Sequence, residues 1–210
     1  MSHAHAITAS ASTETATGVP NGKLGMWVFL ASEVMFFTGL IGAYIVLRMS
    51  NPAGPGSAGH LNVWIGTCNT LILICSSTTI VLALAASQRL PAAPDAAQAG
   101  GDMAALRRWL LATVALGSLF LVIKGFEYAA KFSHEIFPST NVFWSCYFAL
   151  TGFHALHVLG GILFNLVVLS YTRRADLWAD RGHRLELAGL YWHFVDIVWI
   201  FLFPMLYLFK

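Results

Sequence analysis

This sequence has few charged residues for its length. Asp, Glu, Lys and Arg together make up 10% of the 210 residues, whereas hydrophobic residues make up 57%. Soluble domains contain about 25% charged residues, so this chain lacks the polar surface that a water-soluble globule of its size needs. The composition excludes a soluble enzyme, a disordered chain and a nucleic-acid-binding protein with a basic face. It predicts a protein embedded in a lipid bilayer.

Cysteine and the usual catalytic motifs are also scarce. The three cysteines are Cys68, Cys75 and Cys146, and all of them lie inside apolar runs. An odd number of cysteines in such positions argues against a disulfide framework. The sequence has no CxxC motif, no phosphate-binding loop and no Ser/His/Asp arrangement, so we predict no catalytic residue in this chain.

The first 22 residues are small, polar and without periodicity. They lack the apolar core of a signal peptide and the arginines of a mitochondrial transit sequence. We therefore expect residues 1–22 to form a flexible cytoplasmic tail.

Five apolar stretches follow, and each has about the 20 residues that a membrane-spanning helix needs. The segments between them are short and contain most of the Gly, Pro and charged residues. The sequence therefore predicts an all-α membrane protein, in which residues 23–210 form one bundle of five transmembrane helices. The predicted helices cover residues 24–47, 63–86, 109–129, 142–170 and 187–208.

The distribution of positive charge predicts the orientation of this bundle. Cytoplasmic loops carry an excess of Lys and Arg, and the 12 such residues divide into eight on one side and four on the other. We therefore expect the N-terminus in the cytoplasm and the C-terminus outside it, on the periplasmic side. The eight are Lys23, Arg89, Arg107, Arg108, Arg173, Arg174, Arg181 and Arg184; the four are Arg48, Lys124, Lys131 and Lys210.

Glu33 is the polar residue that the first predicted helix places deepest in the membrane. It lies nine residues after Leu24, or about 14 Å along a helix that rises about 1.5 Å per residue. A charge at this depth costs about 2.5–3.5 kcal/mol on insertion scales. The residue is therefore either a protonatable group with a function or a polar contact between helices.

Three later helices carry further polar residues. His154 and His157 are three residues apart in the fourth helix and so share one face. His193 and Asp196 have the same spacing in the fifth helix, with Trp192 beside them. In the third helix, Lys124, Glu127 and Tyr128 lie near the outer surface, where Lys124 and Glu127 can pair or reach the headgroups.

Three interpretations of these residues remain open on spacing alone, and the structural one is favoured. In it, neutral histidines and protonated or paired acids hold the helices together. The second is haem ligation by His154 and His193. The third is a metal site built from Glu33, His154, His157 and Asp196, since imidazole and carboxylate are suitable ligands. Close packing between helices is expected at small residues, and the candidates are Gly39, Gly42, Gly160 and Gly161.

Four ordered motifs resemble one known family, subunit III of the haem–copper terminal oxidases. They are LGMWVFLASEVMFFTGLIGAYIVLR from residue 24, FEY from 126, YFALTGFHALHVLGG from 147 and YWHFVDIVWIFLFPMLYL from 191. The second predicted helix matches the family only by its hydropathy. The chain has five predicted helices where longer members have seven, so it is similar to the short bacterial form.

The resemblance implies a non-redox subunit of a respiratory cytochrome c oxidase in the bacterial inner membrane. Its partners are subunits I and II, which hold the haem and copper, together with structural phospholipid and a possible respiratory supercomplex. The family's buried, carbodiimide-reactive carboxylate corresponds to Glu33. Its polar and lipid-contact positions correspond to Lys124, Glu127, Tyr128, His154, His157, Trp192, His193 and Asp196.

In this resemblance, the chain binds no haem or metal itself. It stabilises the catalytic subunit, supports proton uptake and shapes the access of O2. The alternatives are a subunit of a quinol oxidase, a haem-bearing membrane electron carrier and a small transporter. The acid at Glu33 favours cytochrome c over quinol as the electron donor.

Overall fold

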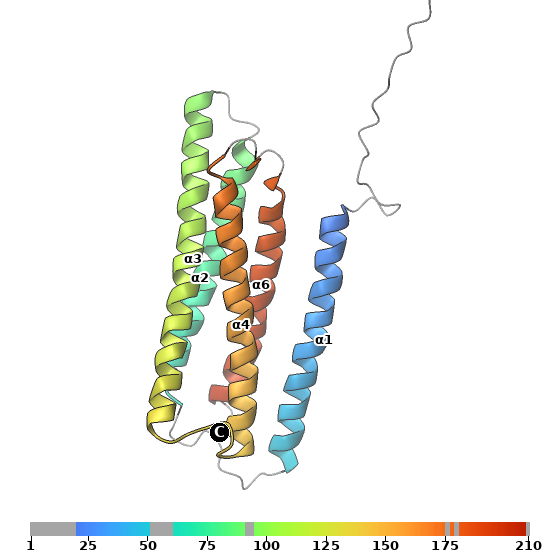
Figure 1. The fold of residues 1–210 in the computed structure, drawn as a ribbon, viewed down its shortest axis with the longest axis vertical. Helices are drawn as coiled ribbons and strands as arrows, with labels where there is room; N and C mark the ends of the chain where they lie inside the picture. Colours follow the sequence, from blue (N-terminus) through green and yellow to red (C-terminus); the bar gives the residue numbers. More distant parts are fainter. Residues whose placement is uncertain (1–19, 51–60, 91–94, 175–176, 179–180, 209–210) are drawn as a thin grey trace, which may run out of the picture.

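The computed structural model describes residues 20–50, 61–90, 95–174, 177–178 and 181–208. Within these residues the chain is all-helical, and five helices are long and apolar enough to cross a membrane. They run alternately up and down the bundle (Figure 1). The helices are α1 (Asn21–Ser50), α2 (Val63–Arg89), α3 (Ala96–Ser133), α4 (Val142–Tyr171) and α6 (Arg184–Phe203), and α6 continues into a π-helical segment, η2 (Pro204–Leu208).

Three helices begin with a side-chain cap, which satisfies backbone N–H groups that have no partner within the helix. The side chain of Asn62 accepts from the N–H groups of Trp64 and Ile65 at the start of α2. The side chain of Asp95 accepts from the N–H group of Gln98 at the start of α3. The side chain of Asn141 accepts from the N–H group of Trp144 at the start of α4.

The largest difference from the sequence prediction is the start of α3. We expected a connection up to residue 108, whereas α3 begins at Ala96. The physical reason is the Asp95 cap followed by an alanine-rich segment, because alanine has the highest helix propensity. The predicted flexible tail lies almost entirely in residues 1–19, outside the described part of the chain, and α1 already begins at Asn21.

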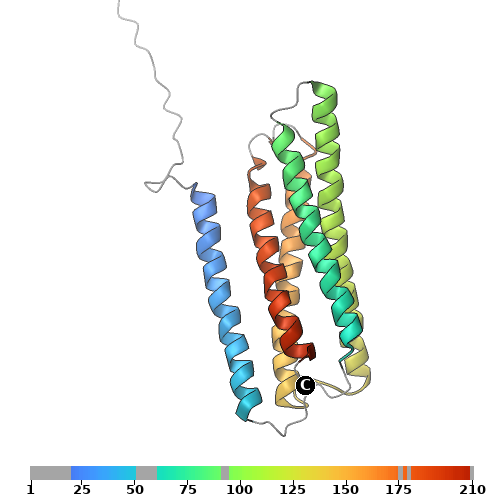
Figure 2. The same ribbon diagram turned by 180° about the vertical axis from the view of Figure 1, so that it is seen from behind.

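Four helices form the body of the bundle, and α1 stands at its edge (Figures 1 and 2). The most extensive contact is between α2 and α3. Helix α4 packs against α3 and α6, and α2 also packs against α6. Helix α1 packs chiefly against α4 and α6, so its remaining faces are open in the isolated chain.

Trp192 of α6 lies at the centre of the bundle and is fully buried. Its indole N–H donates to the hydroxyl of Ser76 on α2 at 3.0 Å. Its ring lies against two glycines, Gly117 of α3 and Gly161 of α4. The missing side chains at these glycines make room for the indole, so one tryptophan contacts three other helices.

The outward faces of the helices are strongly apolar. Met35 of α1, Trp64 of α2 and Phe126 of α3 are each more than 70% exposed in the isolated chain. Water would disfavour such surfaces, whereas lipid tails or the apolar faces of neighbouring helices match them. The outer surface therefore fits a bilayer and further transmembrane partners.

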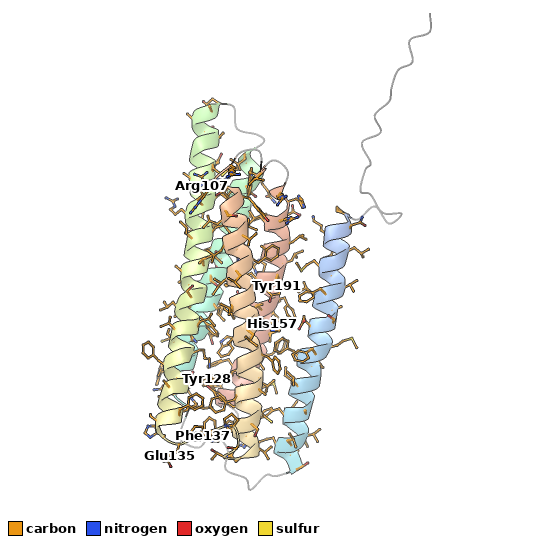
Figure 3. The ribbon with its side chains drawn as sticks, viewed as in Figure 1. Arg107, Tyr128, Glu135, Phe137, His157 and Tyr191 are labelled. Atoms are coloured by element: carbon orange, nitrogen blue, oxygen red, sulfur yellow. The ribbon has the colours of Figure 1, made fainter. Side chains whose placement is uncertain are left out.

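The two ends of the bundle are distinguished by the residues that lie there. We call them the Arg107 end and the Glu135 end, after the residues that mark them in Figure 3. At the Arg107 end, α3 is tied to the end of α4 because the guanidinium of Arg107 donates to the backbone carbonyl and the hydroxyl of Thr172. Helices α1, α3 and α6 begin at this end, and α2 and α4 end there (Figure 1).

Candidate functional site

Glu33 of α1 pairs with His157 of α4. The Oε2 atom of Glu33 lies 3.0 Å from Nε2 of His157, and the two side chains are 19% and 17% exposed. The sequence left open whether Glu33 is a protonatable group with a function or a polar contact between helices, and the structure places it against His157. This pair is the polar contact between α1 and α4. Helix α1 also reaches the bundle through Lys23, which pairs with Glu186, and through Tyr44, which donates to the backbone carbonyl of Met205.

The contacts of His157 indicate the position of one proton and the need for a second one. Its Nδ1 atom is 2.8 Å from the backbone carbonyl of Phe153. A carbonyl oxygen only accepts hydrogen bonds, so Nδ1 carries a hydrogen. The contact between Nε2 and Glu33 then needs one further proton, held either by the imidazole or by the carboxyl group. The pair has no net charge in either arrangement, which suits its depth in the membrane.

Aromatic residues surround this pair. The ring of Phe37 packs edge-on against the His157 ring, with 5.1 Å between ring centroids. The hydroxyl of Tyr191 donates to the backbone carbonyl of His157 at 3.0 Å. Figure 3 shows His157 and Tyr191 at the side of α4 and α6 that faces α1. These aromatic contacts limit the access of water to the pair.

Glu127 is the centre of a second polar cluster, near the Glu135 end. Its Oε2 atom accepts from Lys124 at 3.0 Å, and its Oε1 atom accepts from Lys131 at 3.0 Å. Two tyrosine hydroxyls also donate to Oε1, from Tyr147 at 3.0 Å and from Tyr207 at 2.6 Å. Lys124 donates to the Tyr207 hydroxyl as well. This cluster joins α3, α4 and η2.

Sequence reasoning identified only part of the Glu127 cluster. It left open whether Lys124 and Glu127 pair or reach the headgroups, and it placed Lys131 in the connection after the third predicted helix. Lys131 is instead 4% exposed within α3, one helical turn after Glu127. The i, i+4 spacing was a signal for this pair. Tyr147 and Tyr207 gave no such signal, because they come from other helices.

Tyr128 lies beside the Glu127 cluster and has a partner of its own. Its hydroxyl is 2.5 Å from the hydroxyl of Thr151 on α4. The Thr151 hydroxyl also donates to the backbone carbonyl of Tyr147. Tyr128 therefore adds a second link between α3 and α4.

His154 and His157 have different surroundings although they share one face of α4. His154 is 1% exposed, and its ring stacks on Trp199 at 4.9 Å and meets Phe120 edge-on at 5.6 Å. Neither of its ring nitrogens has a hydrogen-bond partner among the described residues. His154 is thus an aromatic packing residue in the core, and it does not join the Glu33 pair.

The polar residues of α6 face α2. Nδ1 of His193 lies 2.7 Å from the hydroxyl of Ser77. Asp196 is 5% exposed, and neither of its carboxyl oxygens has a hydrogen-bond partner among the described residues. The sequence predicted only that His193 and Asp196 share one face of the helix, and the structure shows that the partner of His193 is Ser77 on α2.

The metal interpretation of the sequence is wrong for the described part of the chain. Of its four residues, Glu33 and His157 meet as a pair, and no group of three or more His, Cys, Asp or Glu side chains there is placed to hold a metal ion. The haem interpretation joined His154 to His193. His154 is instead enclosed by Phe120 and Trp199, and Nδ1 of His193 contacts Ser77.

The four candidate packing glycines separate into two groups. A Cβ at Gly161 would lie 2.7 Å from Trp192, and one at Gly160 would lie 3.2 Å from the Tyr191 hydroxyl. A Cβ at Gly39 or Gly42 would meet no atom within 4 Å. These two glycines of α1 therefore do not pack against another helix of this chain, in contrast to the prediction. Their faces belong to the open side of α1.

The fold and these sites define a multi-pass helical membrane protein, in which paired polar groups are buried between apolar helices. The family described as cytochrome c oxidase subunit III matches residues 5–210, and the chain belongs to this family.

Individual relatives agree with this assignment. Cytochrome c oxidase subunit 3 of Corynebacterium diphtheriae is 38% identical over 189 residues, which cover 88% of this chain and 86% of the relative. The protein of the same name from Thermostichus vulcanus is 38% identical over 186 residues, with the same coverage. The probable cytochrome c oxidase subunit 3 of Mycobacterium leprae is 32% identical over 185 residues, again with 88% and 86% coverage.

Proposed function

We propose that this chain is a non-redox subunit of a respiratory cytochrome c oxidase in a bacterial inner membrane. The family match over residues 5–210 carries this proposal. In such a complex, O2 is reduced to water at haem and copper held by subunits I and II. The role of this chain is to stabilise the catalytic subunit, to bind phospholipid and to support proton uptake and O2 access.

The distribution of polar groups supports a packing role. Glu33 and Glu127 have partners within the chain, at His157 and at two lysines. Large apolar side chains cover the outer faces of the helices. A bundle of this kind presents apolar surface to lipid and to partner helices, and its internal pairs hold the helices in register.

A groove between α2 and α3 at the Glu135 end supports lipid binding. Its volume is about 750 Å³, and its walls include Trp64, Phe126, Glu127, Lys131 and His134. The Glu127 cluster contains two lysines and one carboxylate, so with all three ionised it carries one excess positive charge. We propose that a phospholipid places its anionic headgroup at this cluster and its acyl chain along the apolar wall.

The Glu33–His157 pair is the protonatable site that we propose for support of proton uptake. It holds one exchangeable proton between two side chains, and it lies between α1 and α4. Because the pair is neutral, it can remain deep in the membrane at little electrostatic cost.

For the electron donor we propose cytochrome c. The relatives above carry the name cytochrome c oxidase, and Glu33 is present in this chain. A quinol-oxidase subunit is the alternative, and a donor assay on the purified complex distinguishes the two.

Purification of the tagged chain from its native membranes tests the proposed function. We expect the large and second oxidase subunits to copurify, with a haem spectrum and cytochrome c oxidase activity. After detergent has released it from the complex, the chain itself should be colourless. A haem spectrum of the released chain would identify a haem-bearing carrier, and ion flux through vesicles containing only this chain would identify a transporter.

A further inference from the structure

Asp196 is a membrane-embedded carboxyl group whose two oxygens lack hydrogen bonds. It is the middle residue of the 25-residue span from Arg184 to Leu208, with twelve residues on each side. It is 5% exposed, and neither oxygen makes a hydrogen bond of ordinary geometry among the described residues. The polar group beside it is the Ser77 hydroxyl, which also lies 2.7 Å from Nδ1 of His193. Leaving a buried polar group unsatisfied costs about 1–3 kcal/mol, and more if it is charged. Glu33 and Glu127, by contrast, are paired within the chain.

Asp196 lies at a groove between α2 and α6, which we call the α2–α6 groove. Its cavity has a volume of about 290 Å³ and is lined by Ile74, Ser77, His193, Asp196, Ile197 and Ile200. Figure 2 shows these two helices side by side on the near face of the bundle, with nothing in front of them.

The rim of the α2–α6 groove is aliphatic. The side chains of Ile74, Ile197 and Ile200 are 44%, 53% and 46% exposed. A second cavity of about 290 Å³ shares His193 with the first and extends the groove towards α1 and the Arg107 end. The groove is thus a largely apolar trough along the bundle, with the Asp196 carboxyl group near its middle and the Lys23–Glu186 pair at its Arg107 end.

We propose that a transmembrane helix of the large catalytic subunit occupies the α2–α6 groove and donates a hydrogen bond to Asp196. This inference rests on the proposed function, and it identifies the face of the chain that contacts that partner. The donor belongs to a hydroxyl, amide, indole or cationic side chain on the partner helix.

Chemical complementarity selects this occupant over a lipid tail. Acyl chains have no hydrogen-bond donors, and the bilayer core offers no water to satisfy an exposed polar group. A helix supplies both requirements of the groove, since its apolar side chains match the three isoleucines and one polar side chain reaches the carboxyl group. Polar contacts of this type join helices within membranes.

Substitution of Asp196 separates a role in the partner contact from a role in folding. Asp196→Leu should change the melting temperature of the isolated chain little, because the interaction of Asp196 within the described chain is limited to the Ser77 hydroxyl. The same substitution should lower the affinity for the catalytic subunit about tenfold, which corresponds to one lost hydrogen bond. Asp196→Asn keeps an acceptor oxygen and should retain most of the affinity.

Photo-crosslinking in the intact complex tests the location. A benzophenone-bearing phenylalanine analogue at Ile197 should link to the catalytic subunit. The same analogue at Phe126, which is exposed on α3, serves as the control and should not. A link from Ile197 to lipid, or to a second copy of this chain, would overturn the inference. So would an Asp196→Leu variant that binds the catalytic subunit normally, or one that unfolds in the absence of that subunit. If the unmodified chain copurifies with no oxidase, the proposed function fails first.

Discussion

Gly161 of α4 lies so close to Trp192 of α6 that a Cβ at this glycine would be 2.7 Å from the indole ring. Gly117 approaches the same ring from α3, where an added Cβ would be 2.6 Å away. The indole N–H is fixed by Ser76 of α2. The position of α6 in the bundle therefore depends on the absence of side chains on two neighbouring helices.

Replacement of Gly161 by leucine should destabilise the isolated chain. The new side chain has to displace Trp192, and overpacking of a well-packed core costs about 1–3 kcal/mol. The measurement is thermal unfolding in mild detergent, together with recovery of the catalytic subunit in a pull-down. Gly39→Leu is the matched control, because an added Cβ there meets no atom within 4 Å. Equal melting temperatures for the two variants would contradict the assigned role of Gly161.

Replacement of Glu127 by glutamine should be the most destabilising of the carboxyl-to-amide changes. It leaves the ammonium groups of Lys124 and Lys131 close together without a counter-charge, and breaking a buried pair costs about 3–5 kcal/mol. Glu186→Gln is the control, since Glu186 pairs with Lys23 at 2.5 Å but both side chains are 40% exposed. Exposed pairs contribute about 0–1 kcal/mol.

A second substitution checks that charge causes the Glu127 effect. Adding Lys131→Met to Glu127→Gln restores the original excess of one positive charge in the cluster. Thermal unfolding of the double variant should show partial recovery relative to Glu127→Gln alone. If the double variant were less stable than the single one, shape and hydrogen bonding would be the dominant contribution instead.

Hydropathy alone was enough to predict the five helices, because membrane spans need about 20 apolar residues. The start of α3 was missed because residues 96–108 carry polar and glycine residues that hydropathy counts against a span. Their helix depends on the Asp95 cap and on local propensity. The same error placed Lys131 in a connection, although it lies inside α3.

The partners of the polar residues were harder to predict than their depth. The spacing placed both histidines on one face of α4, but helix rotation decides that His157 meets Glu33 while His154 stacks on Trp199. Tyr207 reaches Glu127 across 80 positions of sequence. A single sequence contains no record of such contacts, because they depend on which helices are neighbours.

Replacement of Glu33 by alanine should leave haem content and the initial rate of O2 reduction nearly intact. The chain holds no redox centre in the proposed function, and the hydrogen-bond partner of Glu33 is His157 on a neighbouring helix. The expected effect is a shorter working life of the complex, since α1 loses its polar contact with α4. The measurement is O2 consumption followed over many turnovers, with Ser32→Ala as a control on an exposed neighbour. Loss of haem from the Glu33→Ala complex would contradict the assignment.

The orientation of the bundle in the membrane is a further prediction that the structure makes specific. Helices α1, α3 and α6 begin at the Arg107 end, where α2 and α4 end (Figure 1). Eight of the 12 lysines and arginines belong to this end or to its connections. Since cytoplasmic segments carry the excess of positive charge, the Arg107 end should face the cytoplasm.

A C-terminal fusion to a reporter that is active only outside the cytoplasm should then be active, and the same reporter fused after Arg89 should be inactive. Activity of a cytoplasm-specific reporter at the C-terminus would reverse the orientation, and with it the side from which the Glu33–His157 pair is reached.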